Sequence, residues 1–315
     1  MMRLTNNMVS NRVLSDLQTG YKAMATTQEQ VSTGKRVNRP SDDPTAAAQA
    51  RLRAADLEGV LRSKDSVAGA QSWLGQAENG LSTVNDILSR AKELTLSAAN
   101  GSLSQNDRNS IAAEIDQLTQ AAKDAMNAKS GDAYIFSGTK SDAPPYSAAT
   151  GDTYQGDTNA VVREAGPGVA LQVNPSFTPV GGGTASLTAD ALLGGGMGAA
   201  DGKVLATLQT LSSHLRSGTP ADIALIGTSD LQALEANRVA AGDARSMVGA
   251  TTNRADSAES RLADLEDATN QSIDDLTGAD MVKAITTLTA QQSAYQASLK
   301  VGAQIIQPSL VDFLR

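Results

Sequence analysis

Two adjacent aspartates are the residues of this chain whose spacing most suggests chemistry. Asp42 and Asp43 lie in the stretch GKRVNRPSDDP, residues 34–44, together with three cationic side chains. Paired carboxylates can bind a divalent cation or act as a general acid and base. The chain has no cysteine, and this stretch holds no histidine and no third acid at ligand spacing. We therefore expect neither a metal nor another cofactor here.

The same stretch has the residues that end one helix and begin the next. Gly34 stands where a helix C-terminus favours a left-handed residue. Pro44 moves Asp43 out of the helical region, which suits Asp43 as an N-cap with Pro44 at the first helical position. We therefore interpret the stretch as a hinge between helices rather than a catalytic site. The expected hinge and cap residues are Gly34, Asn38, Pro40, Ser41, Asp43 and Pro44.

The single histidine, His214, is the only possible base of a catalytic triad. It lies in LQTLSSHLRSG, outside any G-x-S-x-G context, and a lone histidine is more often a surface helix residue than a catalyst. The glycine-rich GGGMGA, residues 194–199, follows no predicted strand and is better explained as a loop than as a nucleotide site. The sequence therefore indicates no catalytic residue. A hydrolase built into residues 141–200 stays open as an alternative, without a nucleophile and base to name.

Composition narrows the class of protein. The 315 residues carry a formal net charge of −8, whereas a protein that binds nucleic acid through phosphate contacts needs a basic face. Tyr134, Phe136 and Tyr146 are therefore expected to pack a small β unit rather than to stack on a nucleic acid. Aromatic residues make up only 3% of the chain, which favours an elongated architecture packed with Ala and Leu. No apolar run approaches the ~18 residues of a membrane span, so no membrane partner is expected.

Apolar residues at alternating spacings of three and four predict long helices. The heptad pattern near the N-terminus runs through Leu14, Leu17, Tyr21, Met24, Gln28 and Val31. The pattern near the C-terminus runs through Met281, Ile285, Leu288, Gln292, Tyr295, Leu299, Gly302 and Ile306. A helix is also predicted over residues 44–98, with the apolar seam Val60, Val67, Ala70, Leu74, Ala77, Leu81, Val84, Leu88 and Ala91. Further helices are predicted around residues 111–125 and 204–215, and helical periodicity resumes after Pro220 and is nearly unbroken over residues 241–276.

The period changes between these helices. Short β-like runs, separated by turns rich in Gly and Pro, occur at residues 133–140, 160–164 and 169–173. Pairing the two chain ends is the simplest way to bury the terminal seams. We therefore predict a mainly α fold with a small β-rich insert: an elongated antiparallel helical bundle or coiled coil made from both chain ends, with the β domain at its tip. The expected domains are terminal assembly helices (1–40 with 281–315), a helical rod (41–140 with 220–280) and a β-rich outer domain with a short helix (141–219).

Four stretches carry a resemblance to the bacterial flagellin superfamily. GKRVNRPSDDPTAAA (34–48) resembles the linker of that superfamily, and SMVGATTNRADSAESRL (246–262) is similar to its return helix. YIFSGTKSDAPPY (134–146) and PSLVDFL (308–314) resemble the members at the hook–filament junction more than the flagellins of the filament. The resemblance covers essentially the whole chain, more loosely between residues 147 and 230.

The resemblance implies a structural protein of the bacterial flagellum rather than an enzyme. Its implied partners are a hook-associated protein on the hook side, flagellin on the filament side, further copies of the chain in a helical ring, and a flagellar export chaperone. It also implies terminal helices that are disordered in the monomer, and an extracellular location reached by flagellar type III export. A compact flagellin that forms the filament itself is the alternative. The residues expected at the assembly interface are Leu14, Leu17, Tyr21, Met24, Val31, Met281, Ile285, Leu288, Tyr295, Leu299, Ile306, Leu310 and Phe313.

Overall fold

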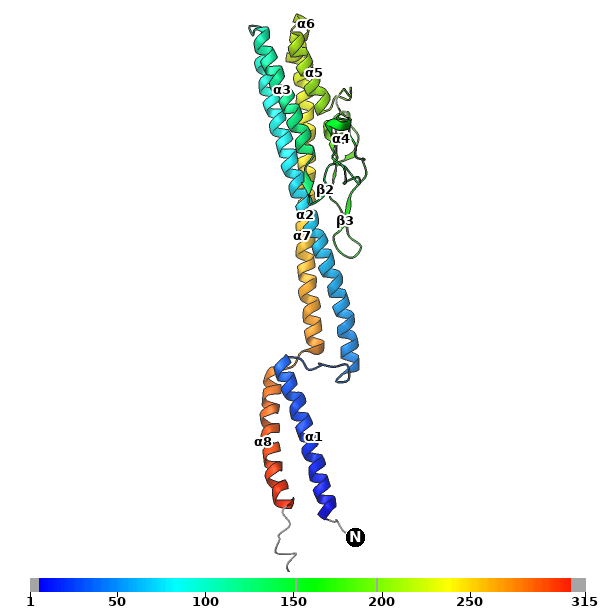
Figure 1. Ribbon diagram of the computed structural model, residues 1–315, viewed down its shortest axis with the longest axis vertical. Helices are drawn as coiled ribbons and strands as arrows, with labels where there is room; N and C mark the ends of the chain where they lie inside the picture. Colours follow the sequence, from blue (N-terminus) through cyan, green and yellow to red (C-terminus); the bar gives the residue numbers. More distant parts are fainter. Residues whose placement is uncertain (1–5, 151, 197, 307–315) are drawn as a thin grey trace, which may run out of the picture. The chain divides into compact units, whose positions relative to one another are not determined.

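A computed structural model describes residues 6–150, 152–196 and 198–306 of the chain (Figure 1). These residues are mainly helical, and no helix among them is both long and apolar enough to span a membrane. The chain divides into two compact units: Met1–Gly59 with Leu265–Arg315, called the terminal unit, and Val60–Asp264, called the core unit. The borders of the three domains predicted from the sequence differ from those of these two units. Which segments fold independently stays a prediction.

The terminal unit is built from both ends of the chain. It contains α1 (Asn6–Thr33), α8 (Met281–Ile306), the beginning of α2 (Pro44–Ala98) and the end of α7 (Leu231–Thr277). Helices α1 and α8 lie side by side (Figure 1). They run antiparallel, because Gly20 contacts Tyr295, whereas Gly302, near the end of α8, contacts Val13 near the start of α1. The prediction that the two chain ends pair as antiparallel helices is confirmed.

The core unit packs α2 and α7 with α3 (Gln105–Met126) and α5 (Val204–Ser217), which precede the short α6 (Pro220–Leu225) and the π-helical turn η2 (Ile226–Asp230). The predicted apolar seam of α2 is buried, with no member more than 4% exposed. One hydrophobic cluster joins this seam to α7, from Val60 to Leu262. Burial of this cluster is the main stabilising contribution in the core unit.

Ion pairs on the outside of the core unit connect α2 with α7. Arg245 Nη2 lies 2.5 Å from Glu78 Oε1, and Lys92 Nζ lies 2.9 Å from Glu235 Oε2. All four side chains are more than a third exposed. Exposed pairs of this kind contribute at most ~1 kcal/mol each, so they orient the helices more than they stabilise them.

The segment between α3 and α5 forms the β-rich insert. Its antiparallel strand pairs are β1 (Lys129–Ser130) with β2 (Ala133–Tyr134), β3 (Val162–Glu164) with β4 (Ala170–Gln172), and β5 (Ser176–Phe177) with β6 (Ala185–Ser186). The turn η1 (Ala148–Thr150) and the helix α4 (Ala189–Leu193) complete it. The strands are shorter than the predicted β-like runs, because each sheet has only two strands and turns follow after two or three paired residues.

The insert lies along the flank of the core-unit helices, which corrects its predicted position at the tip of the bundle (Figure 1). Phe136 is 1% exposed and packs against Gly80 of α2, where a Cβ atom would lie 2.9 Å from the Phe136 ring. The Arg163 guanidinium lies over the Trp73 ring, 5.8 Å from its centre. Contacts with the middle of α2 therefore hold the insert at the side of the bundle.

Two helices begin before the first residue of their regular apolar period. Helix α3 begins with a capping box, in which the Ser104 side chain accepts the backbone N–H of Asp107 and the Asp107 side chain accepts the backbone N–H of Ser104. Helix α7 begins at Leu231, inside the helical pattern that resumes after Pro220 and ten residues before the nearly unbroken apolar period from Ala241. The first turns of helices are often polar and carry no apolar period, so the seam predicts the middle of a helix better than its start.

Candidate assembly interface

The two breaks in the helical pattern, one after α1 and one before α8, lie against each other in the terminal unit. Gly34 has a φ of +70°, and its carbonyl accepts the backbone N–H of Ala279 at 2.9 Å. The backbone N–H of Arg36 donates to the carbonyl of Thr277 at 2.7 Å. The predicted hinge is therefore paired with a second segment of the chain.

Both aspartates of the opening stretch bind backbone N–H groups. Asp43 Oδ1 accepts the N–H of Ala46 at 3.0 Å, as an N-cap does. Asp42 Oδ2 accepts the N–H groups of Asn38 at 3.1 Å and Arg39 at 2.8 Å. No cluster of three or more metal-ligating side chains occurs in the parts of the chain that the structure describes. The two carboxylates therefore shape the turn before α2.

The remaining predicted hinge residues lie in the same turn. Asn38 Nδ2 donates to the carbonyl of Lys35 at 3.2 Å. Pro40 and Ser41 are exposed at the turn itself, and Pro44 is the first residue of α2. The side chains of this hinge therefore contact mainly the hinge's own backbone.

Arg36 is a hinge residue that the sequence pattern does not single out. Its Nη2 donates to the carbonyl of Leu276 at 3.0 Å, and its Nη1 donates to Asp43 Oδ2 at 3.2 Å. The Ala46 N–H and the Arg36 guanidinium together hold the pKa of Asp43 below its usual value. Because Leu276 is 240 residues away along the chain, no local spacing could reveal this link.

Replacing Asp43 by alanine is expected to lower the melting temperature by a few degrees, because the first turn of α2 loses its cap. Asp43→Asn keeps an acceptor for the Ala46 N–H and is expected to cost less. Asp42→Ala is expected to cost about as much as Asp43→Ala, because two N–H groups lose their acceptor. Circular dichroism melts of the three variants measure these differences.

Acid should remove the advantage of the wild-type aspartate over Asp43→Asn. Because the pKa of Asp43 is lowered in the folded chain, its carboxylate stabilises the fold at a pH above the unfolded-state pKa. This stabilisation is lost as the pH falls through the folded-state pKa.

Titration calorimetry with Ca²⁺, Mg²⁺ or Mn²⁺ is the check on the cap interpretation. Binding that disappears in both alanine variants would make the pair a metal site instead.

The predicted interface residues on α1 and α8 separate into two groups. Half-buried side chains are those of Leu17, Met24, Val31, Leu288 and Tyr295. Exposed side chains, with exposed fractions from 38% to 57%, are those of Leu14, Tyr21, Met281, Ile285 and Leu299. Ile306 is the last residue of α8, and Leu310 and Phe313 lie outside the described residues.

The contact seam between α1 and α8 differs from the predicted heptads at every second position. Half-buried or buried positions at heptad spacing on α1 are Val13, Leu17, Gly20, Met24, Thr27 and Val31. Those on α8 are Ala284, Leu288, Gln291, Tyr295 and Gly302. Small residues such as Gly20, Ala284 and Gly302 let the two backbones approach closely. Their larger neighbours in the sequence therefore lie outside the seam.

The five exposed residues lie on one side of the α1–α8 pair. Leu14 and Tyr21 each follow a seam residue of α1, and Ile285 follows a seam residue of α8. One residue advances about 100° around a helix, and in an antiparallel pair this advance turns both helices toward the same side. We call this side the ridge; its residues are Leu14, Tyr21, Met281, Ile285 and Leu299. These exposed large apolar side chains make the ridge a candidate interaction surface.

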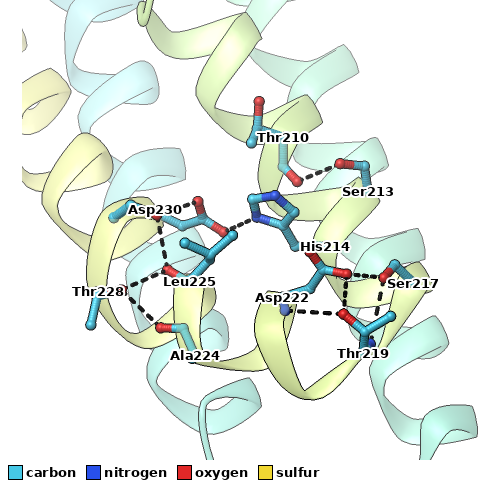
Figure 2. A network of polar contacts seen from close by, with 11 residues as sticks. Thr210, Ser213, His214, Ser217, Thr219, Asp222, Ala224, Leu225, Thr228 and Asp230 are labelled. Atoms are coloured by element: carbon cyan, nitrogen blue, oxygen red, sulfur yellow. Dashed lines mark hydrogen bonds and ion pairs between the residues drawn. The ribbon is translucent and has the colours of Figure 1, made fainter.

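His214 connects α5 to the turn η2 in the core unit. Figure 2 shows its Nδ1 facing Asp230 Oδ2 at 2.7 Å. Asp230 is 5% exposed, so the expected surface position of His214 is corrected to a contact with a buried carboxylate. Nearby hydroxyls have other partners, because Ser213 Oγ donates to a backbone carbonyl and Ser217 Oγ donates to Asp222. The arrangement therefore holds two helical segments together and prepares no nucleophile.

Both ends of the chain match families of flagellar proteins. Residues 4–141 match the bacterial flagellin N-terminal helical region, and residues 231–314 match the bacterial flagellin C-terminal helical region. Several similar proteins are named flagellin or flagellar filament protein, and the matched part is at most 40% of this chain. The matched regions contain the hinge, the seam and the ridge.

Proteins named flagellar hook-associated protein 3 are similar to a larger share of this chain. That of Salmonella typhimurium is 33% identical over 168 residues, which cover 52% of this chain and 51% of that protein. That of Escherichia coli is 28% identical over 283 residues, which cover 86% of this chain and 87% of that protein. The solved structure of a hook-associated protein from Vibrio parahaemolyticus, 20% identical, has a TM-score of 0.64 and covers 75% of this chain and 100% of its own.

Proposed function

Because this chain belongs to the bacterial flagellin family, we propose that it is a structural protein of the flagellum that joins the hook side to the filament. The similarity to hook-associated protein 3 over 86% of the chain supports the junction role. The weaker coverage by flagellins, 40% or less, disfavours the alternative of a compact filament flagellin.

The exposed ridge on the α1–α8 pair is the observation that carries this function. Burying a large aliphatic or aromatic side chain contributes ~1.5–3 kcal/mol, so covering five half-exposed ones contributes on the order of 5 kcal/mol per chain. Isolated helices and short pairs of helices are marginal in water without such burial. The terminal helices are therefore proposed to become fully ordered only when neighbours in an assembly cover the ridge, and to be disordered in the free monomer.

The proposed partners follow from the junction role. One end of the subunit contacts a hook-associated protein, the other contacts flagellin, and copies of the chain form a ring between them. Export by the flagellar type III apparatus with a dedicated chaperone is part of the same proposal, as is the final extracellular position.

A non-enzymatic role agrees with the polar groups of the described residues. The His214–Asp230 pair has no free hydroxyl beside it, and the carboxylates of Asp42 and Asp43 hold backbone N–H groups. The related proteins with the largest coverage are named for a place in the flagellum. We therefore assign no reaction to this chain.

The purified protein is expected not to grow long filaments alone, because a junction subunit has two ends suited to different partners. Negative-stain microscopy of concentrated protein in precipitating salt should show monomers or short oligomers. Added flagellin should then grow from these oligomers, and flagellin without them should nucleate more slowly. Long smooth filaments grown from this protein alone would instead favour the compact-flagellin alternative.

A further inference from the structure

We propose that Asn100 and Gly101, in the turn between α2 and α3, form a site of spontaneous covalent modification. Asn100 loses its side-chain amide and becomes isoaspartate or aspartate, and the new carboxylate of isoaspartate pairs with the buried guanidinium of Arg108. The reaction needs only water, so it requires neither an enzyme nor an assembled flagellum. The inference therefore goes beyond the proposed function and does not depend on it.

The dipeptide Asn-Gly occurs twice in the chain, at residues 79–80 and 100–101. In this dipeptide the backbone nitrogen of the second residue reaches the side-chain carbon Cγ of the first with little hindrance, because glycine has no Cβ and few backbone restrictions. Both asparagines are exposed. The backbone around them therefore decides which of the two pairs reacts.

The first pair is held inside a helix. Asn79 and Gly80 lie within α2, whose backbone N–H groups are used by the hydrogen bonds of the helix. Gly80 is buried, with Phe136 and Ala125 against it. Attack by the Gly80 nitrogen requires the helix to open there, and opening a buried part of a helix is costly. Asn79 is therefore expected to react slowly and serves as an internal reference.

The second pair lies in an exposed turn that follows the end of α2 at Ala98. Among the described residues, the backbone N–H of Gly101 donates no hydrogen bond. A Cβ atom on Gly101 would meet no atom within 4 Å, so the turn is open on this side. The Gly101 nitrogen can therefore lose its proton to water and attack Asn100 Cγ without any helix having to open.

The side-chain oxygen of Asn100 already has the donors that this attack needs. Asn100 Oδ1 accepts the backbone N–H of Ser102 at 3.2 Å and the hydroxyl of Ser102 at 3.0 Å. When the Gly101 nitrogen bonds to Cγ, negative charge develops on this same oxygen. Donors placed beforehand at a developing oxyanion lower the barrier, as in the oxyanion holes of enzymes. The turn therefore favours the reaction more than exposure alone does.

The reaction has two steps that balance without an oxidant or a reductant. In the first step a bond forms between the Gly101 nitrogen and Asn100 Cγ, and the bond from Cγ to Nδ2 breaks. The proton of the Gly101 nitrogen is lost, ammonia leaves, and the product is a cyclic succinimide. In the second step one water molecule opens the ring. Opening at Cγ gives aspartate, and opening at the main-chain carbonyl carbon gives isoaspartate, in which the chain continues through Cγ.

Arg108, in the first turns of α3, is a buried cation without an anionic partner. It is 5% exposed, and it forms no ion pair within the part of the chain that the structure describes. Its Nε is buried without a hydrogen-bond partner among these residues, and its Nη2 donates to the main-chain carbonyl of Asn100 at 3.4 Å. A buried guanidinium that lacks a carboxylate has lost more hydration than its contacts replace.

Isoaspartate supplies this carboxylate at the atom that Arg108 already contacts. The chain of isoaspartate runs through Cγ, so the former main-chain carbonyl of residue 100 becomes the free carboxylate. The oxygen that faces Arg108 Nη2 thus changes from a neutral to a charged acceptor, and charge-assisted hydrogen bonds are about twice as strong. In the succinimide, the guanidinium also polarises this carbonyl, so the ring opens preferentially toward isoaspartate.

Incubation of the folded full-length protein at mildly alkaline pH tests the site. Trypsin then releases Asn79 in the peptide 65–90 and Asn100 in the peptide 93–108, and tandem mass spectrometry measures the exchange of NH2 for OH at each. Asn100 should be converted at least about tenfold faster than Asn79, because only Asn79 needs a helix to open. Equal rates at the two asparagines would overturn the inference.

Two serine variants separate the donors of the turn from simple exposure. Ser102→Ala removes the hydroxyl that donates to Asn100 Oδ1 and should slow the conversion severalfold. Ser110→Ala is the matched control, because its exposed hydroxyl donates to the carbonyl of Asn106 instead, and it should leave the rate unchanged. A Ser102→Ala variant that reacts as fast as the wild type would refute the oxyanion contribution.

The ratio of isoaspartate to aspartate tests the pairing with Arg108. Methylation by a protein isoaspartate methyltransferase counts the isoaspartate. A synthetic peptide of residues 93–105 has the same turn sequence without Arg108, and the folded protein should give a severalfold higher ratio than this peptide. Arg108→Gln should lower the ratio of the protein toward that of the peptide. Equal ratios for the wild-type protein and the peptide would overturn the pairing, and this comparison does not depend on the folding of a variant.

Discussion

A chain shortened to residues 41–280 is expected to remain folded and to lose assembly completely. The hydrophobic cluster that stabilises the protein runs from Val60 to Leu262, inside the shortened chain. The removed helices expose their large apolar residues on the ridge and contribute few buried side chains, such as Ala284. Circular dichroism should show a helical protein with a cooperative melt, and sedimentation in precipitating salt should show only monomers.

A full-length variant with Tyr21, Ile285 and Leu299 replaced by glutamine is the matched control. It keeps both helices and the seam, and it should lose assembly as the shortened chain does, because the ridge has become polar. Unfolding of the shortened chain would mean that the terminal helices belong to the core of the monomer. Assembly of the glutamine variant at the wild-type rate would exclude the ridge as the interface.

Phe136→Ala is expected to lower the free energy of unfolding by roughly 3–5 kcal/mol, the usual cost of removing a buried ring. Phe136 is 1% exposed and lies against Gly80 of α2, so its removal leaves a cavity between the insert and the helices. Leu96→Ala on the same helix α2 is the control. Leu96 is 54% exposed, and its loss should change the free energy by no more than about 0.5 kcal/mol. Urea unfolding of the two variants measures both values.

Gly80→Ala tests the same contact from the other side. Its new methyl group would lie 2.9 Å from the Phe136 ring and 3.2 Å from the carbonyl oxygen of Ala125. Gly80→Ala should therefore lower the free energy of unfolding in the wild-type background. It should lower it less in the Phe136→Ala background, because the crowded ring is gone. Equal losses in both backgrounds would show that the ring does not pack on Gly80.

The local sequence pattern was sufficient to predict a helix and its buried residues where one face of the helix is buried along its whole length. The α2 seam could be predicted because apolar residues recur at spacings of three and four from Val67 to Ala91, and all of them are buried. Proline and aspartate at the start of α2 could be interpreted from their backbone preferences alone. The family and its partners came from motif resemblance, which spacing and composition do not contain.

The same reasoning could not separate seam from ridge on the terminal helices. Two neighbouring heptad frames share Leu17, Met24 and Val31, and the pattern favoured the frame that adds the larger residues. The packed helices use Gly20 and Thr27 instead, because close approach of two backbones needs small side chains. Which frame is buried therefore depends on the partner helix, and the sequence of one helix alone does not determine it.

Contacts between distant segments were likewise beyond local pattern. Arg36 meets Leu276 across 240 residues, and Phe136 reaches the middle of α2 rather than the end of the bundle. The sequence alone was enough for the helices, the hinge caps and the family, because these depend on backbone preference, apolar period and motif. The position of the insert, the pairing of the two breaks and the exposure of the ridge depend on which surfaces meet, and they follow only from the packing of the folded chain.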